Sequence, residues 1–250
     1  MPILCFAGKG GTGKTSFAAL VLKLLVDRGR SKILAVDANP SANLSQTLGV
    51  ALPKTIGDVV SEEFKGNLEE LPPGLDRRSF LGDLMLKTLS KEQAFDLLVM
   101  GRVEAKGCYC LINELLAEVI DDLSKSYDYI LMDMEAGLEH ISRGTARKAD
   151  IMVIMTDPSK MGLQTAKAIQ GLTDKAQMRL KSVYLVGNMF PTEDPSYKIL
   201  EGLGIEIAGI VPMDPNVVSF NLQGRSLLEI PSDSPALAAT EKTMGKMGLL

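Results

Sequence analysis

The feature that most constrains this chain is a glycine-rich segment near its start. Residues 8–15 read GKGGTGKT and satisfy the pattern G-x-x-x-x-G-K-[ST]. Ile3–Ala7 before them is an apolar run typical of a short buried strand, and Lys14–Asp27 carries apolar residues at helical spacing. A strand, such a loop and a helix in this order predict a phosphate-binding P-loop, because successive backbone N–H groups and the helix N-terminus point at the anion. This context disfavours a merely flexible turn.

The loop supplies candidate ligands for a nucleotide and its metal ion, so we expect ATP and Mg²⁺ as cofactors. Lys14 is expected to reach the β- and γ-phosphates, and the Thr15 hydroxyl to bind Mg²⁺. A lysine at position 9 is not required by the general pattern and defines a deviant form of the loop. The nucleotide-binding residues expected here are Gly8, Lys9, Gly10, Gly11, Thr12, Gly13, Lys14, Thr15 and Ser16.

Apolar runs alternate with helical patterns along the chain, which predicts an α/β fold. The runs that read as strands are Ile3–Ala7, Lys32–Asp37, Phe95–Met100, Tyr129–Asp133, Ile151–Thr156, Ser182–Val186 and Glu206–Ile210. The predicted helices are Lys14–Asp27, Ile112–Lys125, Glu139–Ala149, Met161–Lys175, Pro195–Leu203, Asp214–Asn221 and Pro235–Met247. We expect one P-loop domain over residues 1–250, with a mostly parallel sheet of about seven strands and helices on both faces. Leu52–Leu75, rich in Gly and Pro, is expected to be an irregular excursion.

Composition narrows the possible partners. A net charge of −4 provides no basic field for nucleic acid or anionic lipid. No apolar run approaches the roughly 18 residues of a membrane span, and the start reads as a strand rather than a signal peptide. We therefore expect no nucleic-acid or membrane partner and a cytoplasmic location. Three cysteines are too few for a disulfide framework and read as core, metal or redox residues.

Acidic and amide residues end two of the predicted strands, where ligands of parallel sheets bind. Asp37 is expected to face the γ-phosphate, with Asn39 beside it, polarising the attacking water or holding the water shell of Mg²⁺. The alternative is an ordinary turn, since Asn-Pro and Ser are turn formers. Asp133 ends the next such strand and is expected to hold Mg²⁺ through water. The predicted catalytic residues are thus Lys9, Lys14, Asp37 and Asn39, and those for magnesium are Thr15, Asp37 and Asp133.

A second distinctive feature is the pair Cys108 and Cys110, within an expected metal-binding segment at residues 101–111. In an extended segment, side chains at i and i+2 point the same way, so both thiolates could hold one ion. Two thiolates under-coordinate Zn²⁺ or Ni²⁺, and Cys5 reads as core, so a second copy of the chain could supply the missing ligands. Thiolates also accept Cu(I) or an Fe–S cluster, and core thiols or a redox pair are the alternatives.

Together these residues resemble the nickel-insertion ATPases of the CooC/AcsF type, within the SIMIBI class of deviant P-loop NTPases that includes MinD, ParA and the nitrogenase iron protein. The resemblance implies a cytosolic protein that dimerises with ATP, its Lys9 crossing to the partner's nucleotide. It implies Ni²⁺ or Zn²⁺ bound through paired C-x-C segments, and nickel loading of carbon monoxide dehydrogenase or acetyl-CoA synthase. The matching segments are Gly8–Ser16, Val36–Leu48, Met100–Glu104, Gly107–Cys110 and Asp133–Ala146.

The resemblance also suggests roles for residues outside these segments. In P-loop ATPases of this architecture, an asparagine placed like Asn188 reads the adenine edge, and the backbone around Pro212 lines the base. Asn188 as a polar strand terminator is the alternative. Within the matching segment Asp133–Ala146, His140 is the single histidine of the chain, and it is expected to be a structural residue rather than a catalytic one.

One departure concerns Asn39, because relatives often carry a second acid at this position. An amide can hydrogen-bond the attacking water but cannot accept its proton. Since phosphoryl transfer depends mostly on positioning and electrostatics, we expect detectable but slow ATP hydrolysis.

Two other functions compete with metal insertion. One is an ATPase whose dimer is bridged by an Fe–S cluster, as in the nitrogenase iron protein. The other is a MinD- or ParA-like partitioning ATPase without metal chemistry.

Overall fold

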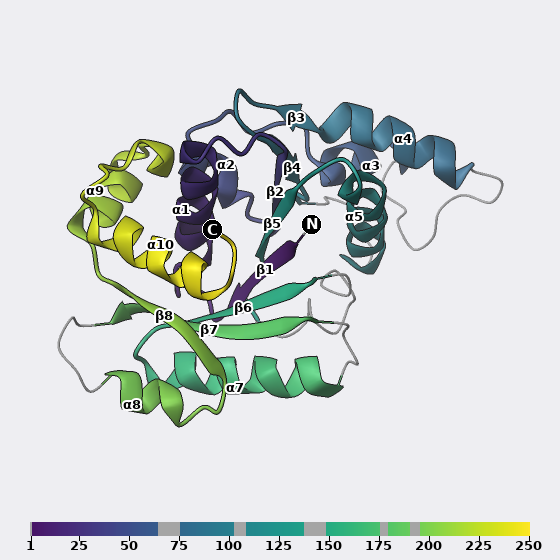
Figure 1. Cartoon of the computed structure of the whole chain (residues 1–250). Coiled ribbons are helices and arrows are strands. Elements are labelled where there is room, and N and C mark those ends of the chain that lie inside the picture. Colours follow the sequence, from purple (N-terminus) through teal and green to yellow (C-terminus); the bar gives the residue numbers. More distant parts are fainter. Residues whose placement is uncertain (1, 65–75, 103–108, 138–148, 176–179, 191–195) are drawn as a thin grey trace.

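Apolar runs form the strands of one sheet in the computed structural model of the protein, which describes residues 2–64, 76–102, 109–137, 149–175, 180–190 and 196–250. The order across the sheet is β3-β4-β2-β5-β1-β6-β7-β8, as Figure 1 shows. The strands are β1 (Ile3–Gly8), β2 (Ile33–Ala38), β3 (Ser90–Lys91), β4 (Asp96–Val99), β5 (Tyr129–Met134), β6 (Ile151–Thr156), β7 (Ser182–Phe190) and β8 (Glu206–Pro212). All neighbouring pairs are parallel except β3 and β4.

The prediction of an α/β fold with a mostly parallel sheet is confirmed. The sheet has eight strands rather than about seven. The additional strand, β3, has two residues and pairs antiparallel with β4 at the edge of the sheet. Two residues are too few to produce a hydrophobic pattern in the sequence, so this strand depends on its neighbour.

Helices cover both faces of the sheet because side chains of successive strand residues point to opposite sides. The helices are α1 (Lys14–Asp27), α2 (Asn43–Leu48), α3 (Ile56–Phe64), α4 (Arg77–Thr88), α5 (Tyr109–Ser124), α7 (Lys160–Lys175), α8 (Ser196–Glu201), α9 (Pro215–Gln223) and α10 (Pro235–Lys246), with a 3₁₀ turn at Leu227–Glu229. In β1, Ile3 and Cys5 pack in one buried cluster with α3, α4, α5 and α7, whereas Leu4 and Phe6 pack in the other with α1, α9 and α10 (Figure 1). None of the helices in the described ranges is long and apolar enough to cross a membrane.

The stretch expected to be irregular contains helix α3, so that expectation is wrong for residues 56–64. Ile56, Val59 and Val60 are buried at spacings of three and four, which is a helical pattern that the nearby prolines and glycines obscure. Helix α4 was not predicted at all. Residues 52–55 form neither helix nor strand, as expected, and residues 65–75 of the stretch lie outside the described residues, as do residues 139–148 of the predicted helix Glu139–Ala149.

Helix α5 begins at Tyr109, three residues earlier than predicted. Cys110 is therefore helical, and the expectation of an extended Cys108–Cys110 segment is wrong at this residue. Cys108 lies outside the described residues. The alternation of side chains along a strand therefore does not apply at Cys110.

One buried carboxylate joins the starts of the two helices that follow β8. Asp214 Oδ1 accepts a hydrogen bond from Asn216 N at 2.8 Å, capping α9. Its Oδ2 accepts from Ser234 Oγ at 2.5 Å and from Ala236 N at 3.0 Å, at the start of α10. Asp214 is 2% exposed, so water could not take the place of its carboxylate, and without it these three donors would lose their hydrogen bonds.

Replacing Asp214 with alanine removes these hydrogen bonds, and we expect Asp214→Ala to lower the free energy of unfolding by about 2–4 kcal/mol. The loss combines a missing helix cap with donors left unpaired in the interior. Urea denaturation followed by circular dichroism measures it. Asp233→Ala, at an exposed neighbouring acid, should stay within about 0.5 kcal/mol of the unchanged protein. Equal effects of the two substitutions would contradict the role of Asp214.

Candidate active site

The P-loop connects the end of β1 to the start of α1 and is packed against β7. Asn188 Nδ2 donates to Thr12 O at 2.9 Å. Gly13 precedes α1 with φ +83°, and a Cβ there would lie 2.1 Å from Asn188 Nδ2. Only glycine fits this position, because both the backbone angle and the approach of Asn188 exclude a side chain.

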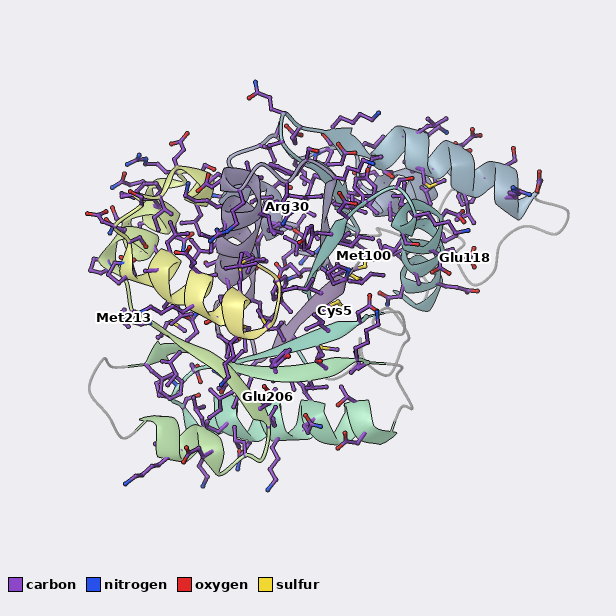
Figure 2. The ribbon with its side chains drawn as sticks, viewed as in Figure 1. Cys5, Arg30, Met100, Glu118, Glu206 and Met213 are labelled. Atoms are coloured by element: carbon purple, nitrogen blue, oxygen red, sulfur yellow. The ribbon has the colours of Figure 1, made fainter. Side chains whose placement is uncertain are left out.

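The loop opens onto a cavity of about 450 Å³ at the carboxyl ends of the strands. Gly10, Gly11 and Gly13–Ser16 line it from the P-loop, while Asn39 and Asn43 line it from the segment after β2. Asn188, with Met189, borders the cavity from β7, and the segment from Val211 to Asp214 borders it from the end of β8. The exposed side chain of Met213 lies at the edge of the molecule in Figure 2. The volume and the donor-rich loop suit a nucleoside triphosphate, with its phosphates on the P-loop.

The two lysines of the loop have different surroundings. Lys14 Nζ donates to the carbonyl oxygens of Gly8 at 3.3 Å and Lys9 at 3.2 Å, and burial lowers its pKa while the charges of Asp133 and Glu135 oppose that shift. Lys9 Nζ lies 3.3 Å from Asp157 Oδ2, just after β6. The side chains of this pair are 29% and 16% exposed, so the pair contributes no more than about 1 kcal/mol. Lys9 can therefore leave Asp157 for a phosphate at little cost.

Three oxygen-bearing side chains meet beside the loop. Asp37 and Asp133 are direct neighbours in the register of β2 and β5. The Thr15 hydroxyl donates to Asp133 Oδ2 at 2.5 Å, and Asp133 Oδ1 is buried with no hydrogen-bond partner among the described residues. A hydroxyl and carboxylates are the hard ligands that Mg²⁺ prefers, so this cluster fits the ion that accompanies a nucleotide.

Burial controls the charge of both acids. The pKa of Asp133 is raised to about 7, chiefly by burial and also by the charge of Asp37, while the Thr15 hydrogen bond and the charge of Lys14 act in the opposite direction. Burial also raises the pKa of Asp37 to about 6, against the hydrogen bonds from Leu44 N and Asn39 N. A divalent cation bound beside them would favour the charged form of both acids.

Asp37 organises the turn after β2. Its carboxylate accepts from Asn39 N at 3.0 Å and from Leu44 N at 2.8 Å. Asn39 lines the cavity, and its Oδ1 accepts from Ser41 N at 3.0 Å. Asp37 is fully buried, so its carboxylate supports the loop while Asn39 presents an amide to the cavity.

The structure thus gathers most of the nucleotide residues predicted from sequence at one sheet edge. Lys14, Thr15, Asn39, Asn188 and Pro212 line the cavity, and Asp37 with Asp133 lies behind the loop. In the part of the chain that the structure describes, no three His, Cys, Asp or Glu side chains gather as a metal site. The pair Cys108 and Cys110 stays a prediction, and His140 lies outside the described residues.

Two residues near the loop were missed in the sequence. Asp157 holds Lys9, and Asn221 Nδ2 lies 3.4 Å from Ser16 Oγ. Asp157 directly follows β6, so the rule that ligands gather at strand ends could have found it. Asn221 is near the end of α9 and reaches the P-loop only through tertiary packing, which no local pattern reveals.

The raised pKa of Asp37 predicts a pH dependence of stability in the nucleotide-free, Mg²⁺-free protein. Between pH ~4 and ~6 the folded state binds more protons at Asp37 than the unfolded state, so this residue makes the free energy of unfolding fall as pH rises. The side chain in Asp37→Asn cannot titrate. In this variant we expect the decrease in the free energy of unfolding with rising pH to be smaller by about 1–3 kcal/mol. Urea denaturation from pH 4 to pH 8 measures the difference.

The control for this experiment is Asp233→Asn, at an exposed carboxyl group, which should keep the original pH slope. An Asp37→Asn variant with that same slope would show that Asp37 ionises normally in the folded protein.

Comparison with known proteins places this geometry in a family. An uncharacterised ATP-binding protein of Methanocaldococcus jannaschii is 38% identical, over 98% of each chain. The carbon monoxide dehydrogenase accessory protein CooC of Rhodospirillum rubrum is 28% identical, over 93% of this chain and 90% of that protein. The cell division ATPase MinD of Pyrococcus furiosus has a similar structure, with a TM-score of 0.74 and 24% identity, over 99% of this chain and 98% of that one. The AAA domain family matches residues 2–184, so the chain belongs to that family and has the α/β fold of MinD- and ParA-like P-loop ATPases.

Proposed function

We propose that this protein is an ATP-dependent metallochaperone that inserts nickel into carbon monoxide dehydrogenase or acetyl-CoA synthase. The observation that carries the proposal is the pair Cys108 and Cys110 in a chain that is 28% identical to CooC. Two thiolates separated by one residue suit a soft cargo ion such as Ni²⁺ or Zn²⁺. The P-loop cavity and the cluster of Thr15, Asp37 and Asp133 support a nucleotide-driven cycle.

ATP hydrolysis follows from the residues around the cavity. Thr15 and Asp133 would hold Mg²⁺, and the ion would supply charge neutralisation for the phosphates. Lys14 exchanges its contacts with the loop carbonyls for phosphate oxygens. Asn39 orients the attacking water with its amide, while Asp37 holds the backbone of that turn through two N–H groups. Without a proton acceptor at position 39, turnover is slow, which gives the ATP-bound state time to meet a client protein.

The cargo site needs two copies of the chain. Cys108 and Cys110 from each copy supply the four ligands that thiolate sites of Zn²⁺ and Ni²⁺ require. ATP favours the closed dimer, in which Lys9 exchanges Asp157 for a phosphate of the partner's nucleotide. Hydrolysis releases this contact, the cysteine pairs separate, and the ion passes to the client.

A partitioning or localisation ATPase of the MinD/ParA type is the second candidate function. The structural similarity to MinD supports it directly, since the match covers almost the whole of both chains. This alternative assigns no ligand role to Cys108 and Cys110. An Fe–S cluster between the cysteine pairs is the third, and a brown chromophore in anaerobically purified protein would favour it.

Nickel titration of the anaerobic protein tests the proposal. We expect about one Ni²⁺ per two chains in the presence of Mg²⁺ and a non-hydrolysable ATP analogue, because four thiolates complete the site. Cys108→Ala with Cys110→Ala should abolish this binding and leave ATP binding unchanged. Isothermal titration calorimetry measures the stoichiometry, and size-exclusion chromatography with and without nucleotide reports the dimer.

Cys5→Ala is the matched control for loss of a thiol. Cys5 is fully buried in β1, and burial raises its pKa to about 12, so this thiol is unsuited to metal binding. The control should therefore bind nickel like the unchanged protein. Full nickel stoichiometry in the double variant would contradict the proposed cargo site and favour the MinD/ParA alternative.

A further inference from the structure

The connection that bears the cysteine pair leaves the sheet beside the nucleotide site. It follows β4, and Met100 N at its start donates to Asp37 O at 2.8 Å. The carboxylate of the same Asp37 holds the cavity-lining turn through Asn39 N and Leu44 N. Asp37 thus contacts the turn that lines the cavity through its side chain, and the segment after β4 through its backbone carbonyl. A movement of this turn reaches Met100 through one hydrogen bond.

The start of helix α3 also contacts residues 100–102 of this connection. Gly57 N donates to Met100 O at 2.8 Å. A Cβ at Gly57 would lie 2.1 Å from the carbonyl oxygen of Arg102 and 3.3 Å from that of Met100. The first turn of α3 therefore lies against the backbone of residues 100–102 at a distance that only glycine permits. Figure 2 shows Met100 in the interior, on the side of the sheet that α5 covers.

A second close contact fixes the next residue of the connection. Gly101 has φ +69°, and a Cβ there would lie 2.2 Å from Thr55 Oγ1. Thr55 and Asp58 cap α3 reciprocally: Thr55 N donates to Asp58 Oδ2 at 2.9 Å, and Asp58 N donates to Thr55 Oγ1 at 3.0 Å. The helix start is consequently rigid, and residues 100–102 lie between it and Asp37.

Helix α5, which follows the connection in sequence, packs in the same core as Met100. Cys108 follows Arg102 by six residues, and Cys110 is the second residue of α5. Ile112 and Leu115 of α5 belong to the buried cluster that also contains Met100 and Ile56. Packed interiors transmit displacements rather than absorb them, so a shift at residues 100–102 reaches the core against which Ile112 and Leu115 of α5 pack.

We propose that Gly57 is a positioning residue for the cysteine pair: with Met100 and Gly101 it forms a joint that passes the nucleotide-dependent position of Asp37 to the connection bearing Cys108 and Cys110. The proposal rests on the proposed function in taking these cysteines as the cargo site. It adds the route by which nucleotide binding at the P-loop would affect these cysteines. Gly57 touches neither nucleotide nor cargo and acts through the backbone that it holds.

Thiol reactivity of the full-length protein tests the joint without any metal. Iodoacetamide labels Cys108 and Cys110, mass spectrometry follows each rate, and buried Cys5 serves as the unreactive internal reference. In the unchanged protein we expect Mg²⁺ with a non-hydrolysable ATP analogue to change the rates about fivefold or more, the lower end of measured couplings between sites. In Gly57→Ala we expect less than about a twofold change, at unaltered nucleotide affinity.

Gly82→Ala is the matched control, since Gly82 lies inside the neighbouring helix α4 and a Cβ there meets nothing within 4 Å. Both substitutions place an alanine in a helix, and only the one at Gly57 introduces a Cβ that meets residues 100–102. Gly101→Ala breaks the joint from the other side and should reproduce Gly57→Ala, which keeps the test valid if either variant fails to fold.

Two results would overturn the joint. One is equal nucleotide dependence of thiol reactivity in Gly57→Ala, Gly101→Ala and Gly82→Ala, and the other is a lack of nucleotide dependence in the unchanged protein. The nickel titration tests the proposed metallochaperone function independently of the thiol-reactivity experiment. A protein that binds no nickel, yet shows thiol rates that depend on nucleotide and on Gly57, retains the joint and loses the metallochaperone role.

Discussion

The parallel pairing of β2 with β5 beside the P-loop is the constraint on which the site depends. This register places Asp37 opposite Asp133, and Asp133 accepts the hydroxyl of Thr15. Two buried acids at this distance disfavour each other's charge, which burial already opposes. Backbone N–H groups on Asp37 offset part of this cost, and a cation bound here would offset more of it. A sheet shifted by one residue would point one acid to the opposite face and leave the P-loop without its metal partners.

Asp37 belongs to two systems at once. Its side chain shapes the turn that brings Asn39 to the cavity, and its backbone carbonyl holds the start of the connection after β4. Helix α3 then holds that connection through Gly57. The turn that lines the cavity and residues 100–102 are therefore linked by one short path through the interior, which is built of backbone groups and the carboxylate of Asp37.

Local patterns predicted the parts of the molecule that are dictated by neighbours in sequence. The P-loop, the long apolar strands and the position of Asp133 at a strand end all follow from composition and spacing, and the α/β architecture follows from their alternation. Strand β3 was not predicted because two residues are too few to show a periodicity. Helix α3 was not predicted because Pro53 and Gly57 obscured the helical spacing of Ile56, Val59 and Val60. The extended conformation expected at Cys110 was wrong because α5 begins at Tyr109.

The sequence by itself determined that this chain binds a nucleotide through a P-loop, because consecutive glycines, Lys14 and Thr15 act within one turn of chain. Tertiary structure alone decided which distant residues complete the site. Asn188 lies against the loop from β7, Asp157 holds Lys9, and Gly57 meets the connection that leads to the cysteines. These contacts join segments tens to hundreds of residues apart, and they depend on strand order and register, which the short-range periodicity of a sequence does not encode.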